Sequence, residues 1–105
     1  MAKRQIFNVI TPLGYRVELS RDRWRQITRF KHPALSGREK AVRSCLESPE
    51  IVRESDKDPG VHLYYVNMGA VYLCVVLAPA NADARFVLTA YFTKNIKQGN
   101  EIWKK

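Results

Sequence analysis

The chain has 105 residues, 46% of them hydrophobic, so it is long enough for one packed core and too short for a separate cofactor domain. Its 18 Lys and Arg outnumber its 10 Asp and Glu, and the net charge of +8 favours a polyanionic partner, without separating RNA from DNA or anionic lipid. No apolar run approaches the length of a membrane span and no signal-peptide core forms, which predicts a single cytoplasmic domain over residues 1–105 and no membrane partner.

The start of the chain predicts a β-hairpin. Residues 6–10 are mostly apolar and are typical of a strand. Residues 11–14, Thr-Pro-Leu-Gly, have proline and glycine where turns favour them. Residues 15–19 then alternate apolar and polar side chains, which indicates a second, half-buried strand.

Two helices are expected next. Ser20 is a suitable N-cap, and Trp24, Ile27 and Phe30 recur at every third residue, which predicts one buried stripe on a helix that ends near Lys31. Apolar residues within 41–46 form the buried face of a second helix. One of them is a cysteine, and both cysteines of the chain lie in apolar patterns, so we expect buried free thiols.

The rest of the chain is typical of strands, at residues 51–55, 61–66, 70–78 and 85–93. The third of these is apolar almost throughout and is the best candidate for a central strand. Strands gathered after two helices predict an α+β fold. We expect an N-terminal β-hairpin and two helices packed on one face of a twisted, mostly antiparallel four-stranded sheet, whose other face is free to hold a site.

Motifs for cofactor or metal chemistry are missing from the sequence, which has no P-loop, no dinucleotide-binding glycine pattern, no HExxH and no CxxC pair. We therefore expect no cofactor and no metal. The side chains that remain as candidates suit metal-free cleavage of RNA, in which the 2′-hydroxyl attacks the adjacent phosphate. This reaction needs a base, an acid for the leaving 5′-oxygen and donors that stabilise the phosphorane. DNA lacks the 2′-hydroxyl, so the mechanism selects RNA.

His32 is the main acid–base candidate, because it follows a basic helix and Pro33 excludes it from that helix. A histidine that caps the last helix carbonyls is an equally ordinary interpretation. Arg53 lies on a predicted strand and could clamp a phosphate, or it could be an edge charge that discourages aggregation. His62, next to a turn, is expected at the surface.

Hydroxyl side chains form a second candidate group. Thr89, Tyr91 and Thr93 project from one face of the last predicted strand and could bind phosphate oxygens, and Tyr91 could stack a base or donate a proton. The ordinary alternative is that Thr and Tyr are favoured on a solvated strand face. Tyr64 and Tyr65 point to opposite faces, and the sequence does not say which one joins a site.

The order of several short motifs resembles a known superfamily. These motifs are Trp24-Arg25-Gln26-Ile27, His32-Pro33, Leu46-Glu47-Ser48-Pro49-Glu50-Ile51, Thr89-Ala90-Tyr91-Phe92-Thr93 and Trp103. Over roughly Val17 to Trp103, the chain resembles the phage- and bacteria-borne nuclease domains of the barnase–EndoU–colicin–RelE superfamily. The resemblance implies a two-helix, four-stranded antiparallel core and, in many members, RNase toxin activity.

The resemblance also implies site residues. It gives a catalytic or phosphate-binding role to His32, Arg53, Thr89 and Tyr91, and a substrate-binding role to Tyr65 and Thr93. In the basic run before the histidine, Arg29 and Lys31 are expected to contact substrate. One position departs from the pattern, because such domains often have a histidine where this chain has Gln26. If that histidine is part of the machinery, this chain is weakened or inactive.

We therefore predict a metal-independent endoribonuclease of toxin type, with His32 as general base or acid and Arg53 as the group that stabilises the phosphorane. The alternative is a catalytically inactive module of the same fold that binds RNA or a partner protein. RNA is the expected partner, and an acidic antitoxin or immunity protein is a candidate second one. The RNA target, its base preference and the oligomeric state are left open.

Overall fold

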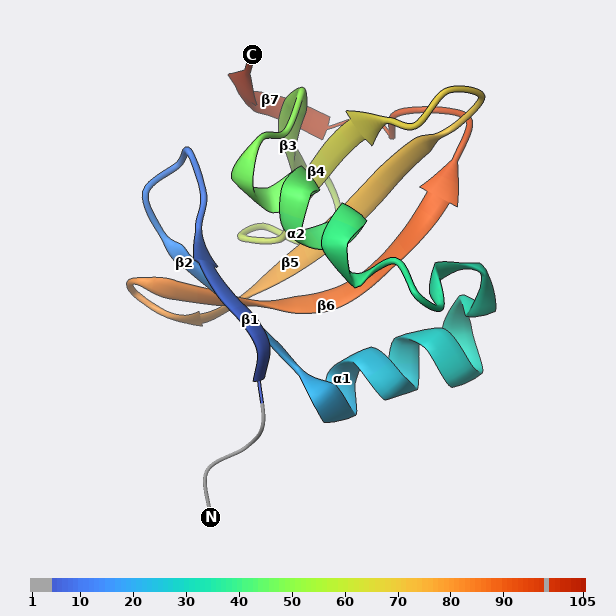
Figure 1. Cartoon of the computed structure of the whole chain (residues 1–105). Coiled ribbons are helices and arrows are strands. Elements are labelled where there is room, and N and C mark those ends of the chain that lie inside the picture. Colours follow the sequence, from blue (N-terminus) through green and yellow to red (C-terminus); the bar gives the residue numbers. More distant parts are fainter. Residues whose placement is uncertain (1–4, 98) are drawn as a thin grey trace.

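The computed structural model describes residues 5–97 and 99–105 (Figure 1). Residues 1–4 and Gln98, which belong to the predicted domain 1–105, lie outside the described residues. None of the helices in the described ranges combines the length and the hydropathy needed to cross a bilayer. In chain order the elements are β1 (Gln5–Ile10), β2 (Arg16–Ser20), α1 (Arg21–Gln26), the π-helical turn η1 (Ile27–Lys31), the 3-10 turn η2 (Pro33–Leu35), α2 (Glu39–Glu47), β3 (Ile51–Ser55), β4 (His62–Asn67), β5 (Tyr72–Asn81), β6 (Ala84–Thr93) and β7 (Gly99–Lys104).

The strands of the described residues form one seven-stranded mixed sheet in the order β1-β2-β6-β5-β4-β3-β7. Neighbours are antiparallel except β2 and β6, which run parallel where Arg16–Glu18 pairs with Ala84–Phe86. The α+β class fits and β5 is central, but the predicted four-stranded sheet is wrong, because the sheet has seven strands and is mixed. The hairpin joins the sheet through β6, and residues 99–104 add a strand beside β3.

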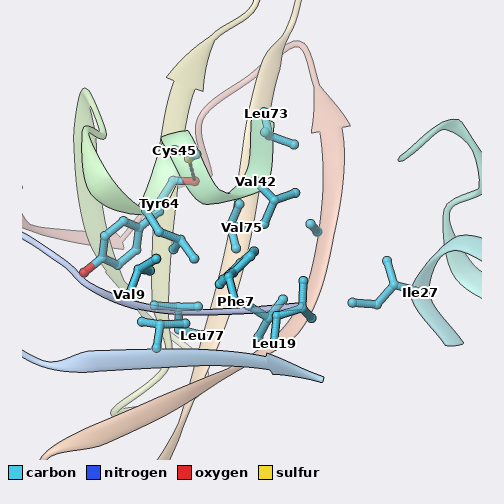
Figure 2. Close-up of a cluster of buried hydrophobic side chains, with 14 of the residues drawn as sticks. Phe7, Val9, Leu19, Ile27, Val42, Cys45, Tyr64, Leu73, Val75 and Leu77 are labelled. Atoms are coloured by element: carbon cyan, nitrogen blue, oxygen red, sulfur yellow. Dashed lines mark hydrogen bonds between the residues drawn. The ribbon is translucent and has the colours of Figure 1, made fainter. Parts of the chain in front are cut away.

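The larger core lies on the face of the sheet that α2 covers. Figure 1 shows α2 in front of β4 and β5, and α1 projecting from the end of β2. Figure 2 shows the packing between these layers, where Phe7 and Leu19 of the hairpin meet Val42 of α2 and Val75 of β5. Each fully buried aliphatic side chain contributes about 1.5–3 kcal/mol relative to exposure. This layer therefore fixes α2 and the hairpin on one side of the sheet.

The other face carries a smaller cluster, formed by Leu63, Tyr65, Cys74 and Val76, and is called the open face below. In the described part of the chain its partly buried neighbours come from the strands and their connections, not from a helix. Tyr64 packs in the larger core and Tyr65 in the open-face cluster. The alternation of the strand therefore places Tyr65, not Tyr64, on the face available to a site.

Helix α1 begins where predicted, but it ends at Gln26, and the π turn η1 continues the helical segment to the predicted end at Lys31. The segment buries only part of the predicted stripe. The Ser20 hydroxyl oxygen accepts a hydrogen bond from the Arg23 N–H at 3.1 Å, which caps the helix. Ile27 is fully buried, whereas Phe30 is 76% exposed. The His32 N–H donates to the Ile27 carbonyl at 2.7 Å, which closes a π turn. A π turn holds more residues than an α turn, so Phe30 is rotated away from the side that Ile27 buries.

A chain of polar side chains lies beneath the turn between β1 and β2. The Tyr64 hydroxyl is 2.8 Å from Thr11 Oγ1 and 2.6 Å from the Tyr15 hydroxyl, which is 2.8 Å from His62 Nδ1. His62 is only 8% exposed, so the expectation of a surface residue is wrong. Alternation along β4 turns it to the same side as Tyr64, where Tyr15 covers it.

We expect the free energy of unfolding to fall when the pH drops from about 7.5 to about 5.5. Burial, and after it the charge of Arg85, lowers the pKa of His62. Below the ordinary imidazole pKa of about 6.5, the unfolded chain binds a proton that the folded chain resists. The contribution of this group is complete above that pH and is lost as the pH falls towards the lower pKa of the folded state.

Denaturant unfolding at a series of pH values measures this dependence. In the His62→Asn variant the side-chain amide can still pair with the Tyr15 hydroxyl but does not titrate, so most of the slope should disappear. A slope that persists in this variant would assign the dependence to another group.

Candidate functional site

Three side chains form a row across the open face on neighbouring strands. Tyr65 of β4 pairs with Cys74 of β5, and Cys74 pairs with Tyr91 of β6. Directly opposed residues on antiparallel strands project to the same face. Further along β6, Thr89 pairs with Val76, which also belongs to the open-face cluster. The hydroxyls of Thr89 and Tyr91 therefore come from the face that no described helix covers.

A pocket of about 590 Å³ lies beside this row. Its base is apolar and includes Leu63, Val76 and Leu88. Its polar residues are Ser55, Asp58, Thr89, Tyr91 and Lys97, so one acidic side chain lies among the donors. The pocket thus combines a surface suited to a flat apolar group with hydroxyl and ammonium donors suited to an anion.

Lys97, in the connection between β6 and β7, joins three of the predicted site residues. Its N–H donates to the Tyr65 hydroxyl oxygen at 3.0 Å, and its carbonyl accepts from Arg53 Nη1 at 3.2 Å. Its ammonium nitrogen lies 5.2 Å from the centre of the Tyr91 ring. Sequence reasoning missed Lys97, because a loop residue has no periodic pattern; its place four residues after Thr93 was the available signal.

Gly99 allows this connection to lie close to β3. A Cβ atom at Gly99 would be 2.5 Å from the carbonyl oxygen of Glu54, so any other residue would push the two strands apart. Gly99 pairs with Ser55 at the start of β7. The close approach of β7 to β3 therefore helps to hold the loop containing Lys97 over Arg53.

His32 reaches the site from the edge of β6. The pairing of β2 with β6 extends only to Phe86, and beyond it the segment that contains η2 contacts β6 (Figure 1). The imidazole ring of His32 and the phenol ring of Tyr91 have centroids 5.6 Å apart and planes tilted by 38°. The π turn that ends at His32 is a kind of helix irregularity often found at functional sites.

Three buried polar atoms in the described part of the chain have no hydrogen-bond partner: Arg53 Nε, Thr89 Oγ1 and Tyr91 Oη. An unpaired buried polar group costs about 1–3 kcal/mol, so most such groups in folded proteins are paired. Arg53 pairs with Leu63 of the open-face cluster, so all three atoms belong to the same face. Thr89 and Tyr91 line the pocket, and Arg53 is hydrogen-bonded to Lys97, which also lines it. Such an arrangement is typical of a site that binds an oxygen-rich ligand.

Burial keeps the phenols and the thiol of this face protonated. Burial, reinforced by Cys74, raises the pKa of Tyr91. Burial also raises the pKa of Tyr65 to about 12 and that of Cys74 to about 11. At neutral pH the phenols can therefore donate hydrogen bonds but not act as bases, and the thiol is not a nucleophile.

The other predicted site residues lie outside this group. The Thr93 hydroxyl donates to the Asn95 carbonyl at 3.0 Å and so organises the connection after β6. Arg29 and Lys31 are exposed on η1 and do not line the pocket. Gln26, at the position where the resembled domains often have a histidine, is exposed at the end of α1.

Tyr91→Phe should change the free energy of unfolding little, because the buried Tyr91 hydroxyl has no oxygen or nitrogen partner and only the thiol of Cys74, a weak hydrogen-bonding group, beside it. Tyr64→Phe is the matched control and should lose about 0.5–1.5 kcal/mol, because that hydroxyl is hydrogen-bonded. Denaturant unfolding of both variants makes the comparison. Equal losses would show that the Tyr91 hydroxyl is bonded within the folded protein.

Comparison with known proteins gives no family assignment. No family model, no curated protein and no solved structure matches the chain. The resemblance to the barnase–EndoU–colicin–RelE superfamily stays a prediction, and the function has to be argued from the open face. Across residues 5–97 and 99–105, no group of three His, Cys, Asp or Glu side chains is placed to hold a metal ion.

Proposed function

We propose that the protein is a metal-independent endoribonuclease of toxin type, which cleaves RNA on the open face by attack of a 2′-hydroxyl on the adjacent phosphate. The observation that carries the proposal is the group of unpaired buried donors, Arg53 Nε, Thr89 Oγ1 and Tyr91 Oη. A phosphodiester supplies oxygen acceptors for such donors, and bonds to it are charge-assisted. The net charge of +8 supports an anionic substrate.

His32 is the proposed base. It takes the proton of the 2′-hydroxyl, the 2′-oxygen forms a bond to phosphorus, and the bond from phosphorus to the 5′-oxygen breaks. The products are a 2′,3′-cyclic phosphate and a free 5′-hydroxyl. The imidazole is suited to this role because it lies beside Tyr91 at the edge of the open face.

Tyr91 is the proposed donor to the departing 5′-oxygen. The raised pKa keeps the proton on its hydroxyl until an alkoxide, a much stronger base, develops next to it. Tyr91 then regains a proton from the His32 imidazolium, whose ring is its neighbour. This return balances the proton taken from the 2′-hydroxyl.

Arg53 and Lys97 are proposed to stabilise the phosphorane. The planar guanidinium of Arg53 has one edge fixed by the Lys97 carbonyl and leaves Nε free for a phosphate oxygen. The ammonium of Lys97 and the hydroxyl of Thr89 line the same pocket. Donors held in place before the reaction are the arrangement that stabilises developing charge most effectively.

The proposed site of action is the cytoplasm, where cellular RNA is available as substrate. The cations Arg53 and Lys97 are also candidate contacts for an acidic antitoxin or immunity protein, which would inhibit the enzyme by covering the phosphate-binding donors.

A DNA oligonucleotide with a single ribonucleotide tests the proposal. With EDTA present, the protein should cleave only on the 3′ side of that ribose and leave a 2′,3′-cyclic phosphate. The all-DNA strand and a strand with a 2′-O-methyl ribose should stay intact. Binding without cleavage would favour the alternative, a non-catalytic RNA-binding module. Cleavage of the all-DNA strand would contradict the mechanism.

A further inference from the structure

Phe30 is an aromatic side chain that the fold does not use. It is 76% exposed and belongs to neither hydrophobic cluster. The π turn places it outside, although its spacing from Trp24 and Ile27 would direct it inward on a regular helix. Exposed aromatic rings that do not pack in a core are common features of surfaces that bind another molecule.

The surroundings of Phe30 are cationic. Arg21, Arg25, Arg29 and Lys31 are all exposed on the same helical segment. The exposed acid of this segment is Asp22 in the first turn, and the salt bridge found in the described residues, Arg43–Glu47, lies on α2. These cations are therefore available to a polyanion, which makes a nucleic acid a better match for this surface than an apolar or basic partner.

Phe30 is also close to the proposed reaction site. It precedes His32 by two residues, so their Cα atoms are at most about 7 Å apart. A strand whose scissile linkage lies between His32 and Tyr91 would carry a neighbouring nucleotide past the exposed ring. Bases in a duplex are already stacked on one another, whereas an unpaired base can stack on an aromatic side chain.

We propose that Phe30 is a stacking platform for one unpaired base of the substrate, next to the scissile linkage, and that Arg25 and Arg29 contact the phosphates of the same strand. This inference rests on the proposed function and narrows the substrate class to single-stranded RNA or unpaired loops. Phe30 gives affinity without strong base preference, because every base has a flat face to stack.

Fluorescence anisotropy with an uncleavable, 2′-O-methylated single-stranded RNA tests the platform. Phe30→Leu, which keeps an apolar side chain but loses the ring, should weaken binding about 10-fold without changing the dependence on salt. Phe30→Trp should keep the affinity, and its indole fluorescence should change on binding. Arg29→Gln should instead lower the slope of log K against log salt by about 1. Ile10→Ala, at another exposed apolar residue, is the matched control and should bind like the wild type.

An abasic nucleotide moved along the strand locates the stacked base. The wild-type protein should bind the strand more weakly when the abasic nucleotide is at one particular position. The affinity of Phe30→Leu should not change when the abasic nucleotide is at that position. The proposal is overturned if Phe30→Leu binds single-stranded RNA with full affinity, or if it loses as much affinity for duplex RNA. It is also overturned if Phe30→Leu dissociates a dimer, because Phe30 then belongs to an interface between copies. The probe cannot be cleaved, so it reports binding separately from catalysis. If the protein binds the probe through Phe30 but never cleaves RNA, the endoribonuclease proposal fails and the stacking proposal stands.

Discussion

Replacing His32 with alanine is expected to lower kcat/KM for RNA cleavage by about 10²- to 10⁴-fold, the range that a positioned general acid–base group contributes. The side chain is half-buried and its ring stands beside that of Tyr91, so its removal leaves the 2′-hydroxyl without a base. Cleavage of a short RNA by the purified variant measures the effect. Undiminished cleavage would remove His32 from the mechanism.

Two further readouts separate a catalytic role from a structural one. Added imidazole should restore part of the activity of His32→Ala, because a diffusible base can occupy the space that the ring leaves. The affinity for an uncleavable oligonucleotide should change little. Lys40→Ala, at an exposed residue of α2 away from the open face, is the control and should keep kcat.

The Arg53→Lys variant is expected to lower kcat by about 10²- to 10³-fold while KM changes little, because the contact is made to charge that develops in the transition state. Lysine keeps the positive charge but lacks Nε and the planar fork. The measurement is steady-state kinetics on a single-ribose substrate. A matched control is Arg43→Lys, an exposed arginine on α2 that pairs with Glu47 at 3.6 Å.

A rise in KM with unchanged kcat would show that Arg53 binds substrate and transition state equally. Wild-type kinetics in Arg53→Lys would contradict a role for Nε altogether. The Lys97 carbonyl, which now accepts from Arg53 Nη1, also holds the loop, so the thermal unfolding of the variant should be compared with that of the wild type.

Local patterns in the sequence predict the strands and helices well, because each depends on neighbouring residues. The alternation from 15 to 19 gives β2, and the apolar run from 70 to 78 gives the central β5. Alternation along β6 also puts Thr89 and Tyr91 on one face. Their hydroxyls and Arg53 Nε, all candidates from the sequence, are the buried polar atoms that have no partner in the described structure.

Non-local contacts explain what the sequence does not predict. The parallel pairing of β2 with β6 is short and joins segments far apart in the chain. Edge strand β7 has only Ile102 and Trp103 as apolar residues, so it lacks a clear alternation. The contacts of Lys97 are with Arg53, Tyr65 and Tyr91, which are distant in the sequence. Phe30 leaves the core because of a π turn, which residue spacing alone does not reveal.

The central claim is that one RNA linkage binds on the open face, between His32 and the donors of β3 and β6. Amide chemical shifts of isotope-labelled protein, followed during titration with an uncleavable single-stranded RNA, test it most directly. We predict the largest changes at Thr89, Tyr91 and Lys97, with residues of α2 unaffected. The largest changes on α2 or the β1–β2 hairpin, with the open face unchanged, would contradict the account.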